Sequence, residues 1–301
     1  MNSLLDFKLI GVGEFSHGIQ QSWEFRFKLL KLAMRNTRKK IFIFNEMSVW
    51  QAENVMNDTI FSRETNKVVP FFESKFKKEE PVKGNTTSSP WGVYWQYVHH
   101  STESTIVMKI FKFVRKNKNR IQLIGVDPDN LDRDYFMYKK IMKHFDPKNI
   151  NFFWAHNSHI SDAPLATYNS RYLTTKNSKK FYCGHYLKNK LGNEYCIILS
   201  QAFSGQQRFN GSCIGKECET RTWSLKYTYN RFHLPSLQKY TNPRKTFQLF
   251  SEYNEPFIYF SNSFFRENEL GASDILLLPK TWDYVLFWNQ VTPLEPIEDY
   301  Y

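Results

Sequence analysis

Several features that mark familiar protein classes are absent from this chain of 301 residues. No apolar run approaches the ~18 residues that a membrane-spanning helix needs, and the first residues lack the basic and apolar regions of a signal peptide. There is no Gly-x-Ser-x-Gly motif, which argues against a hydrolase built on a serine nucleophile elbow. We therefore expect a soluble cytoplasmic protein that does not bind a membrane.

Cysteine is also scarce, and its spacing excludes most metal and disulfide frameworks. The four cysteines are Cys183, Cys196, Cys213 and Cys218, and no two of them form a Cys-x-x-Cys pair. Four cysteines in a chain of this length indicate a reducing compartment rather than a disulfide scaffold. A zinc site from Cys213 and Cys218 is the less favoured alternative.

Basic residues are in excess, with 41 Lys and Arg against 29 Asp and Glu and a net charge of +12. Part of the excess lies in two short runs, 35–40 and 115–120, each of which follows a predicted helix. Cations suit the negative end of the helix dipole, so solvated helix ends are favoured over a nucleic-acid face. Nucleic acid is therefore not the expected partner.

Four apolar runs end on an ionisable residue. They are LIGVGE, IFIFNE, IQLIGVD and INFFWAH, which end at Glu14, Glu46, Asp127 and His156. Each run reads as a buried strand, and the segments between them have a helical period. The pattern predicts a single α/β domain over 1–301, with a mainly parallel central sheet flanked by helices. In such sheets the ligand crevice lies at the carboxyl ends of the strands.

Arg26 occupies an informative position in the first predicted helix. Its apolar stripe runs through Ile19, Trp23, Phe27, Leu30 and Met34, and Arg26 lies within that stripe. A buried cation needs carboxylate partners, and the neighbouring strand ends offer Glu14 and Glu46. The alternative is that the Arg26 side chain bends outward to water.

Histidines stand close to two of the strand ends. The turn GVGEFSHG places His17 three residues after Glu14, and WAHNSHIS contains His156 and His159. A histidine beside a carboxylate can act as a general base, although His17 can also serve only to cap the helix. The segment 62–100, charged and then rich in Gly, Ser, Thr and Pro, is a candidate lid over the same crevice.

Taken in order, these motifs resemble the erythromycin esterase family. GEFSHG stands where the family has its GEATHG-like turn, WEFRFKLLKL supplies the following arginine, and IFIFNE, GVDP and WAHNSHIS match later elements. The resemblance implies a hydrolase whose catalytic residues are His17, Glu14, Glu46, His156, His159 and Arg26, with Asp127 and Asn157 at substrate-binding positions. The interval from Glu46 to His156 is shorter than in the family, which implies a reduced helical lid and leaves the substrate open.

The leading hypothesis is hydrolysis of a small-molecule ester or lactone by water that His17 activates, with no cofactor firmly predicted. In the second hypothesis the same Glu and His cluster binds a divalent metal that supplies the nucleophile. A third is an inactive homologue that binds an anionic or planar ligand, nucleic acid included, through aromatic residues such as Trp91 and Trp95.

Overall fold

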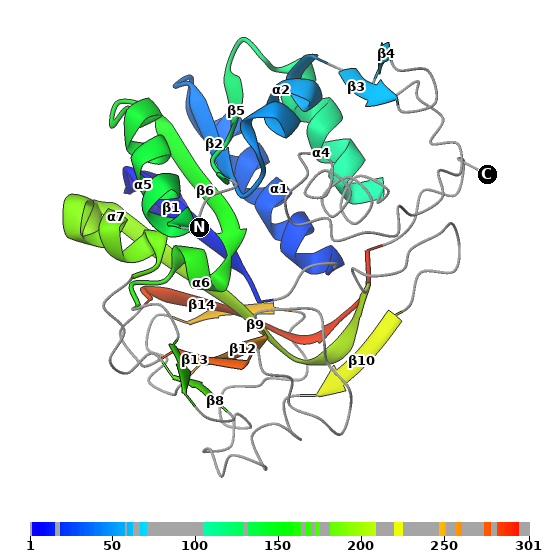
Figure 1. The fold of residues 1–301 in the computed structure, drawn as a ribbon. Helices are drawn as coiled ribbons and strands as arrows, with labels where there is room; N and C mark the ends of the chain where they lie inside the picture. Colours follow the sequence, from blue (N-terminus) through cyan, green and yellow to red (C-terminus); the bar gives the residue numbers. More distant parts are fainter. Residues whose placement is uncertain are drawn as a thin grey trace.

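The structure is a computed structural model. The residues it describes are 2–15, 19–57, 59–62, 67–70, 105–128, 132–163, 167–169, 172–174, 181–208, 220–224, 247–250, 257–260, 274–277 and 282–294. Figure 1 shows helices on both sides of a central sheet.

Six parallel strands form the centre of the main sheet. They are β1 (Leu9–Glu14), β2 (Ile41–Asn45), β5 (Ile121–Gly125), β6 (Ile150–His156), β9 (Tyr195–Arg208) and β14 (Tyr284–Val291). Their spatial order is β14-β9-β1-β6-β2-β5, and β11 (Phe247–Phe250) and β10 (Thr220–Ser224) add antiparallel pairs to β14 and β9. Strands covered on both faces are expected to be apolar throughout, and β1 and β6 are buried at every position. The predicted α/β fold is confirmed.

Two groups of helices flank this sheet. α1 (Gln20–Asn36), α2 (Val49–Asn57) and α4 (Thr105–Lys116) pack together, and α5 (Arg133–His144), α6 (Asn157–Ile160) and α7 (Cys183–Leu191) form the other group. In Figure 1, α1 and α4 lie on the opposite side of the sheet from α5 and α7. Short 3₁₀ turns, η1 (Asn2–Asp6) and η4 (Gly192–Glu194), lie near the amino ends of β1 and β9.

The predicted apolar stripe of α1 is confirmed. Trp23, Phe27 and Leu30 are buried, and Trp23 and Phe27 make edge-on ring contacts with Phe111 and Phe113 of α4. Aromatic pairs in this geometry favour close helix packing. The stripe thus fixes α1 between the sheet and α4.

The remaining strands form two small sheets. β3 (Thr59–Ser62) and β4 (Lys67–Pro70) make an antiparallel hairpin, while β7 (Thr167–Asn169), β8 (Tyr172–Thr174), β12 (Phe257–Phe260) and β13 (Asp274–Leu277) form a four-stranded sheet. The start of the candidate lid 62–100 therefore contains a strand, which its aperiodic sequence did not predict. Residues 71–100 lie outside the described residues, and the lid stays a prediction.

The structure describes only some of the residues on which the cysteine and membrane predictions depend. Cys183 and Cys196 are buried free thiols, while Cys213 and Cys218 lie outside the described residues. In the described ranges, no helix has the length and apolar character needed to cross a membrane.

Candidate active site

The sheet register brings the predicted strand-end residues together. Glu14 lies opposite His156 in the pairing of β1 with β6. Glu46 follows β2 and donates its backbone N–H to Trp154 of β6, while Asp127 follows β5 and donates its backbone N–H to Met47. The four side chains named at the ends of the apolar runs are all buried, with exposed fractions of 3 to 8 %. The predicted crevice residues thus meet at one edge.

Arg26 is buried, as its position in the helix predicted. Its guanidinium donates to the Glu14 carboxylate at 3.0 Å and to the backbone carbonyls of Val12 and Ala155 at 3.2 and 3.0 Å. The two side chains are 2 % and 5 % exposed. Because one cation bridges β1 and β6 at their carboxyl ends, the ion pair fixes the place where the chain leaves β1.

Arg133 is a site residue that the sequence analysis missed. It donates to both Asp127 oxygens, from Nε and Nη2 at 2.6 Å each, and Nη2 also donates to Glu46 at 2.7 Å. It lies in the first turn of α5, where a charged pair such as Arg133 and Asp134 reads as an ordinary solvated helix start. Its side chain is 39 % exposed, so this cation reaches from the buried carboxylates to solvent.

His159 lies between two carboxylates. Nδ1 is 2.7 Å from Asp134 Oδ1, and Nε2 is 3.2 Å from Glu46 Oε1. Burial opposes the charged imidazolium, as does Arg133, whose Nη1 lies 3.2 Å from Nε2, but Asp134 and Glu46 outweigh both effects and raise the pKa of His159 to about 10. His159 is therefore protonated at neutral pH and attracts the Glu46 carboxylate. Asp134 also accepts the Cys183 backbone N–H, which ties α7 to the same cluster.

The His156 ring contacts a backbone carbonyl and a hydroxyl. Its backbone N–H donates to Glu46 Oε2 at 2.7 Å, Nε2 lies 3.2 Å from the Phe15 carbonyl, and Nδ1 lies 3.1 Å from the Ser158 hydroxyl. A carbonyl can only accept, so this geometry assigns the proton to Nε2. His156 thereby holds Phe15, the last described residue before the turn that carries His17.

The two residues predicted to bind substrate are engaged within the protein. Asn157 is fully buried, and its amide donates to the Ser200 carbonyl and accepts the Ser200 N–H. Asp127 is held by Arg133, and burial raises its pKa while Arg133 opposes the rise. Both help to assemble the edge, and their contact with substrate stays a prediction.

His17 itself lies outside the described residues, but both flanks of its turn are anchored. On one side Phe15 is fully buried and bonded to His156. On the other, Ile19 forms a bridge with Pro293, and the Gln20 N–H donates to the Thr292 carbonyl.

The described cluster contains nearly balanced charge. Its carboxylates are Glu14, Glu46, Asp127 and Asp134, and its cations are Arg26, Arg133 and His159. Over the part of the chain that the structure describes, no three His, Cys, Asp or Glu side chains are arranged to hold a metal ion. Buried, mutually paired ionisable groups at a strand edge are typical of catalytic sites.

The fold and this cluster define an α/β protein whose acid–base groups gather at the carboxyl edge of a parallel sheet. Residues 99–216 match the family model named Erythromycin esterase. This match confirms, over residues 99–216, the resemblance to that family expected from the sequence.

Solved structures show the same fold at low sequence identity. A Bacillus cereus protein aligns with a TM-score of 0.61 and 11 % identity, covering 99 % of this chain and 92 % of its own. A succinoglycan biosynthesis protein gives 0.57 and 13 %, covering 96 % and 89 %. A mutant of the erythromycin esterase EreC, in its open conformation, gives 0.55 and 9 %, covering 99 % and 94 %. Comparison with curated proteins finds no match.

Proposed function

We propose that this protein hydrolyses a small-molecule ester or lactone with water that His17 activates as general base. The observation that carries the proposal is the buried cluster in which Arg26 holds Glu14 and Arg133 holds Glu46 and Asp127. Burying so many charges is costly, and replacing such pairs by apolar residues is often neutral for stability. Their retention at the ligand edge of the fold therefore favours a chemical role.

Chain geometry supports His17 as the base. His17 is two residues from Phe15 and two from Ile19, both anchored at the carboxyl edge. Consecutive Cα atoms are about 3.8 Å apart, so the Cα of a residue two steps away lies within about 8 Å of each anchor. Glu14 begins the same turn with a fixed carboxylate, which suits a partner that orients an imidazole.

In this proposal Arg133 stabilises the oxyanion that forms when water attacks the carbonyl. Its guanidinium is the partly exposed cation of the described cluster, and the carboxylates fix its orientation. His159 acts indirectly, because both of its ring nitrogens already face carboxylates. Its positive charge attracts Glu46, which in turn holds Arg133.

The test compares turnover of a panel of p-nitrophenyl esters and lactones by the wild type, His17→Asn and the control His144→Asn. His144 ends α5 and is exposed, so its replacement leaves activity unchanged. General-base loss lowers kcat by about 10²-fold or more. A His17→Asn protein with wild-type kcat on a substrate that the enzyme turns over contradicts the proposal.

A chelation series separates this route from the metal-dependent alternative. With His17 as base, activity survives removal of divalent ions. Loss of activity on chelation, with recovery on adding one divalent metal, supports a metal-generated nucleophile instead.

A further inference from the structure

The net positive charge of this protein comes from two segments of the sequence, each a helix with the residues that follow it. Segments 20–40 and 105–120, which contain α1 and α4 with their C-terminal extensions, hold thirteen Lys and Arg and one acidic residue, Glu24. Their excess equals the net charge of +12 of the whole chain, so the remaining residues together are neutral. Apart from Arg26, which is buried against Glu14, these cations attract anions to the two segments.

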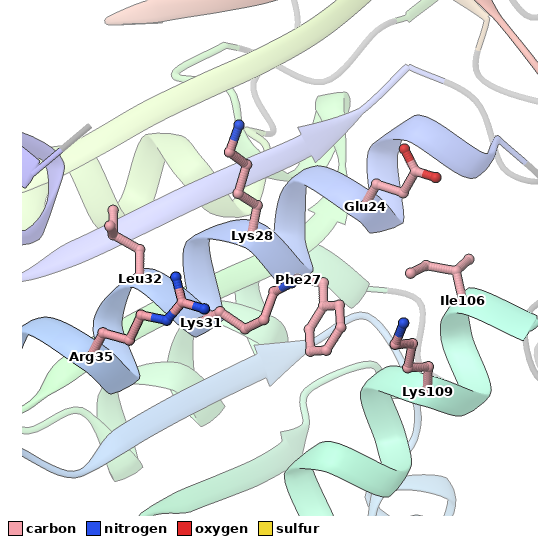
Figure 2. A pocket seen from close by; sticks show the side chains of 8 residues that line it. All are labelled: Glu24, Phe27, Lys28, Lys31, Leu32, Arg35, Ile106 and Lys109. Atoms are coloured by element: carbon pink, nitrogen blue, oxygen red, sulfur yellow. The ribbon is translucent and has the colours of Figure 1, made fainter.

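A groove lies within this basic region, between α1 and α4. Its volume is about 470 Å³, and it is lined by Glu24, Phe27, Lys28, Lys31, Leu32, Arg35, Ile106 and Lys109. Figure 2 shows Phe27 between the two helices, with Ile106 and Lys109 projecting from the α4 side. The volume is in the range of small-molecule sites.

The lining combines cations with apolar surface. α1 contributes Lys28, Lys31 and Arg35, and α4 contributes Lys109, against the single carboxylate of Glu24. Three of these cations are exposed, and Lys31 is half-buried with Nζ 4.4 Å from the centre of the Phe27 ring. The groove thus offers charge for an anionic group and apolar walls for an attached hydrocarbon body.

The groove is separate from the candidate active site. Arg26 leaves α1 on the buried side and bonds to Glu14, whereas the groove residues open on the side facing α4 and solvent. A ligand there would not contact the carboxylate cluster.

We propose that the α1/α4 groove is a binding site for a small amphiphilic anion, a phosphate monoester on an apolar body. A nucleic-acid strand is disfavoured because Phe27, the aromatic residue of the lining, is only 6 % exposed and packs against Phe113. It therefore presents no open ring face on which a base can stack. A flat lipid surface is disfavoured because the cations line a concave groove.

Calorimetric titration of the full chain with monomeric dodecyl phosphate tests this site, with inorganic phosphate and decanol as partial ligands. We expect one saturable site for dodecyl phosphate that weakens as KCl rises, and much weaker binding of either partial ligand. The double variant Lys31→Glu with Lys109→Glu weakens binding by about tenfold or more. Leu32→Gln weakens the binding of dodecyl phosphate but leaves the binding of inorganic phosphate unchanged, because Leu32 supplies an apolar wall of the groove.

The matched control is Lys143→Glu with Lys148→Glu, which changes net charge equally at exposed positions away from the groove. Its affinity stays at the wild-type value, and circular dichroism melting checks the fold of every variant. If the charge-reversal variant Lys31→Glu with Lys109→Glu does not fold, the neutral variant Lys31→Gln with Lys109→Gln takes its place. An equal loss of affinity for dodecyl phosphate in the groove variant and the control variant overturns the proposal. So does saturable binding only to a single-stranded oligonucleotide, or only to anionic vesicles.

Discussion

At the scale of single residues, the buried pair of Arg26 and Glu14 is the contact most sensitive to substitution. Arg26→Met removes the cation from a carboxylate that is 5 % exposed and leaves two carbonyls without this donor. We expect the free energy of unfolding to fall by about 3–5 kcal/mol, as for other broken buried pairs. Urea unfolding followed by circular dichroism measures the change.

The double variant Arg26→Met with Glu14→Gln separates the ion pair from the packing of the arginine stem. Neutralising Glu14 removes the buried charge that has lost its Arg26 partner, so the double variant is more stable than Arg26→Met alone. Arg38→Met, at an exposed position beyond α1, is the control and stays within about 0.5 kcal/mol of the wild type. A double variant that is less stable than both single variants contradicts the assignment.

His159 gives the cluster a defined dependence on pH. Its pKa is raised to about 10, above the ordinary value near 6.5. A raised pKa means that the folded state holds the proton more tightly than the unfolded chain. The contribution of protonated His159 to the stability of the fold is therefore complete below a pH of about 6.5, and it is lost as the pH rises through about 10.

The measurement is the difference in urea midpoint between the wild type and His159→Gln from pH 6 to 10.5, because the difference cancels titrations common to both proteins. The difference shrinks at alkaline pH, since the wild type alone loses the imidazolium. His144→Gln, at an exposed position, shows no such trend. A difference that is constant over this range means that His159 is neutral in the folded protein.

At the scale of elements, β5 and the connection after β2 are packed too closely for any side chain between them. A Cβ on Gly125 would lie 2.0 Å from the Ser48 carbonyl oxygen and 2.7 Å from that of Met47. Gly125→Ala therefore displaces the backbone that follows Glu46. We expect a loss of about 1–3 kcal/mol in stability, as for other overpacked sites, together with lower kcat.

Gly192→Ala is the control for this prediction. Gly192 has φ of 55°, so alanine is strained there, but a Cβ would meet no atom within 4 Å. This variant loses about 1 kcal/mol in stability with kcat unchanged, which separates general destabilisation from movement of Glu46. Equal losses of kcat in both variants contradict the proposed displacement.

The strands and the strand-end residues were predictable because parallel strands buried on both faces leave continuous apolar runs in the sequence. The site roles of Arg133 and Asp134 were not predictable, because a charged helix start is ordinary. Only the fold reveals that Arg133 contacts Glu46 and that Asp134 contacts His159. The sole hint was their place directly after the strand end that carries Asp127. The edge strand β11 was also not predicted, since four residues are too few to establish a period.

At the scale of the whole molecule, the residues that follow β14 contact the start of α1. The end of β14 leads into Thr292 and Pro293, which contact Ile19, Gln20 and the side chain of Gln21. The Gln21 amide both donates to the Thr292 hydroxyl at 3.0 Å and accepts the Thr292 N–H at 2.9 Å. The residues that directly follow 16–18 in the sequence are thus held by Thr292 and Pro293, some 270 residues later.

Gln21→Ala removes this brace while leaving the catalytic groups intact. Two hydrogen bonds are lost, each contributing about 1 kcal/mol or less at a solvent-exposed position, so stability changes little. The residues after His17 lose one of their anchors, and we expect kcat on the ester substrate to fall with KM nearly unchanged. Gln20→Ala is a close control. Among the described residues, the Gln20 side chain bonds to Glu24 on the same helix, and its backbone bond to Thr292 is kept in the variant. If the two variants have the same kcat, the closing strand does not hold the turn for catalysis, and the anchor on the β1 side, through Arg26 and His156, is sufficient.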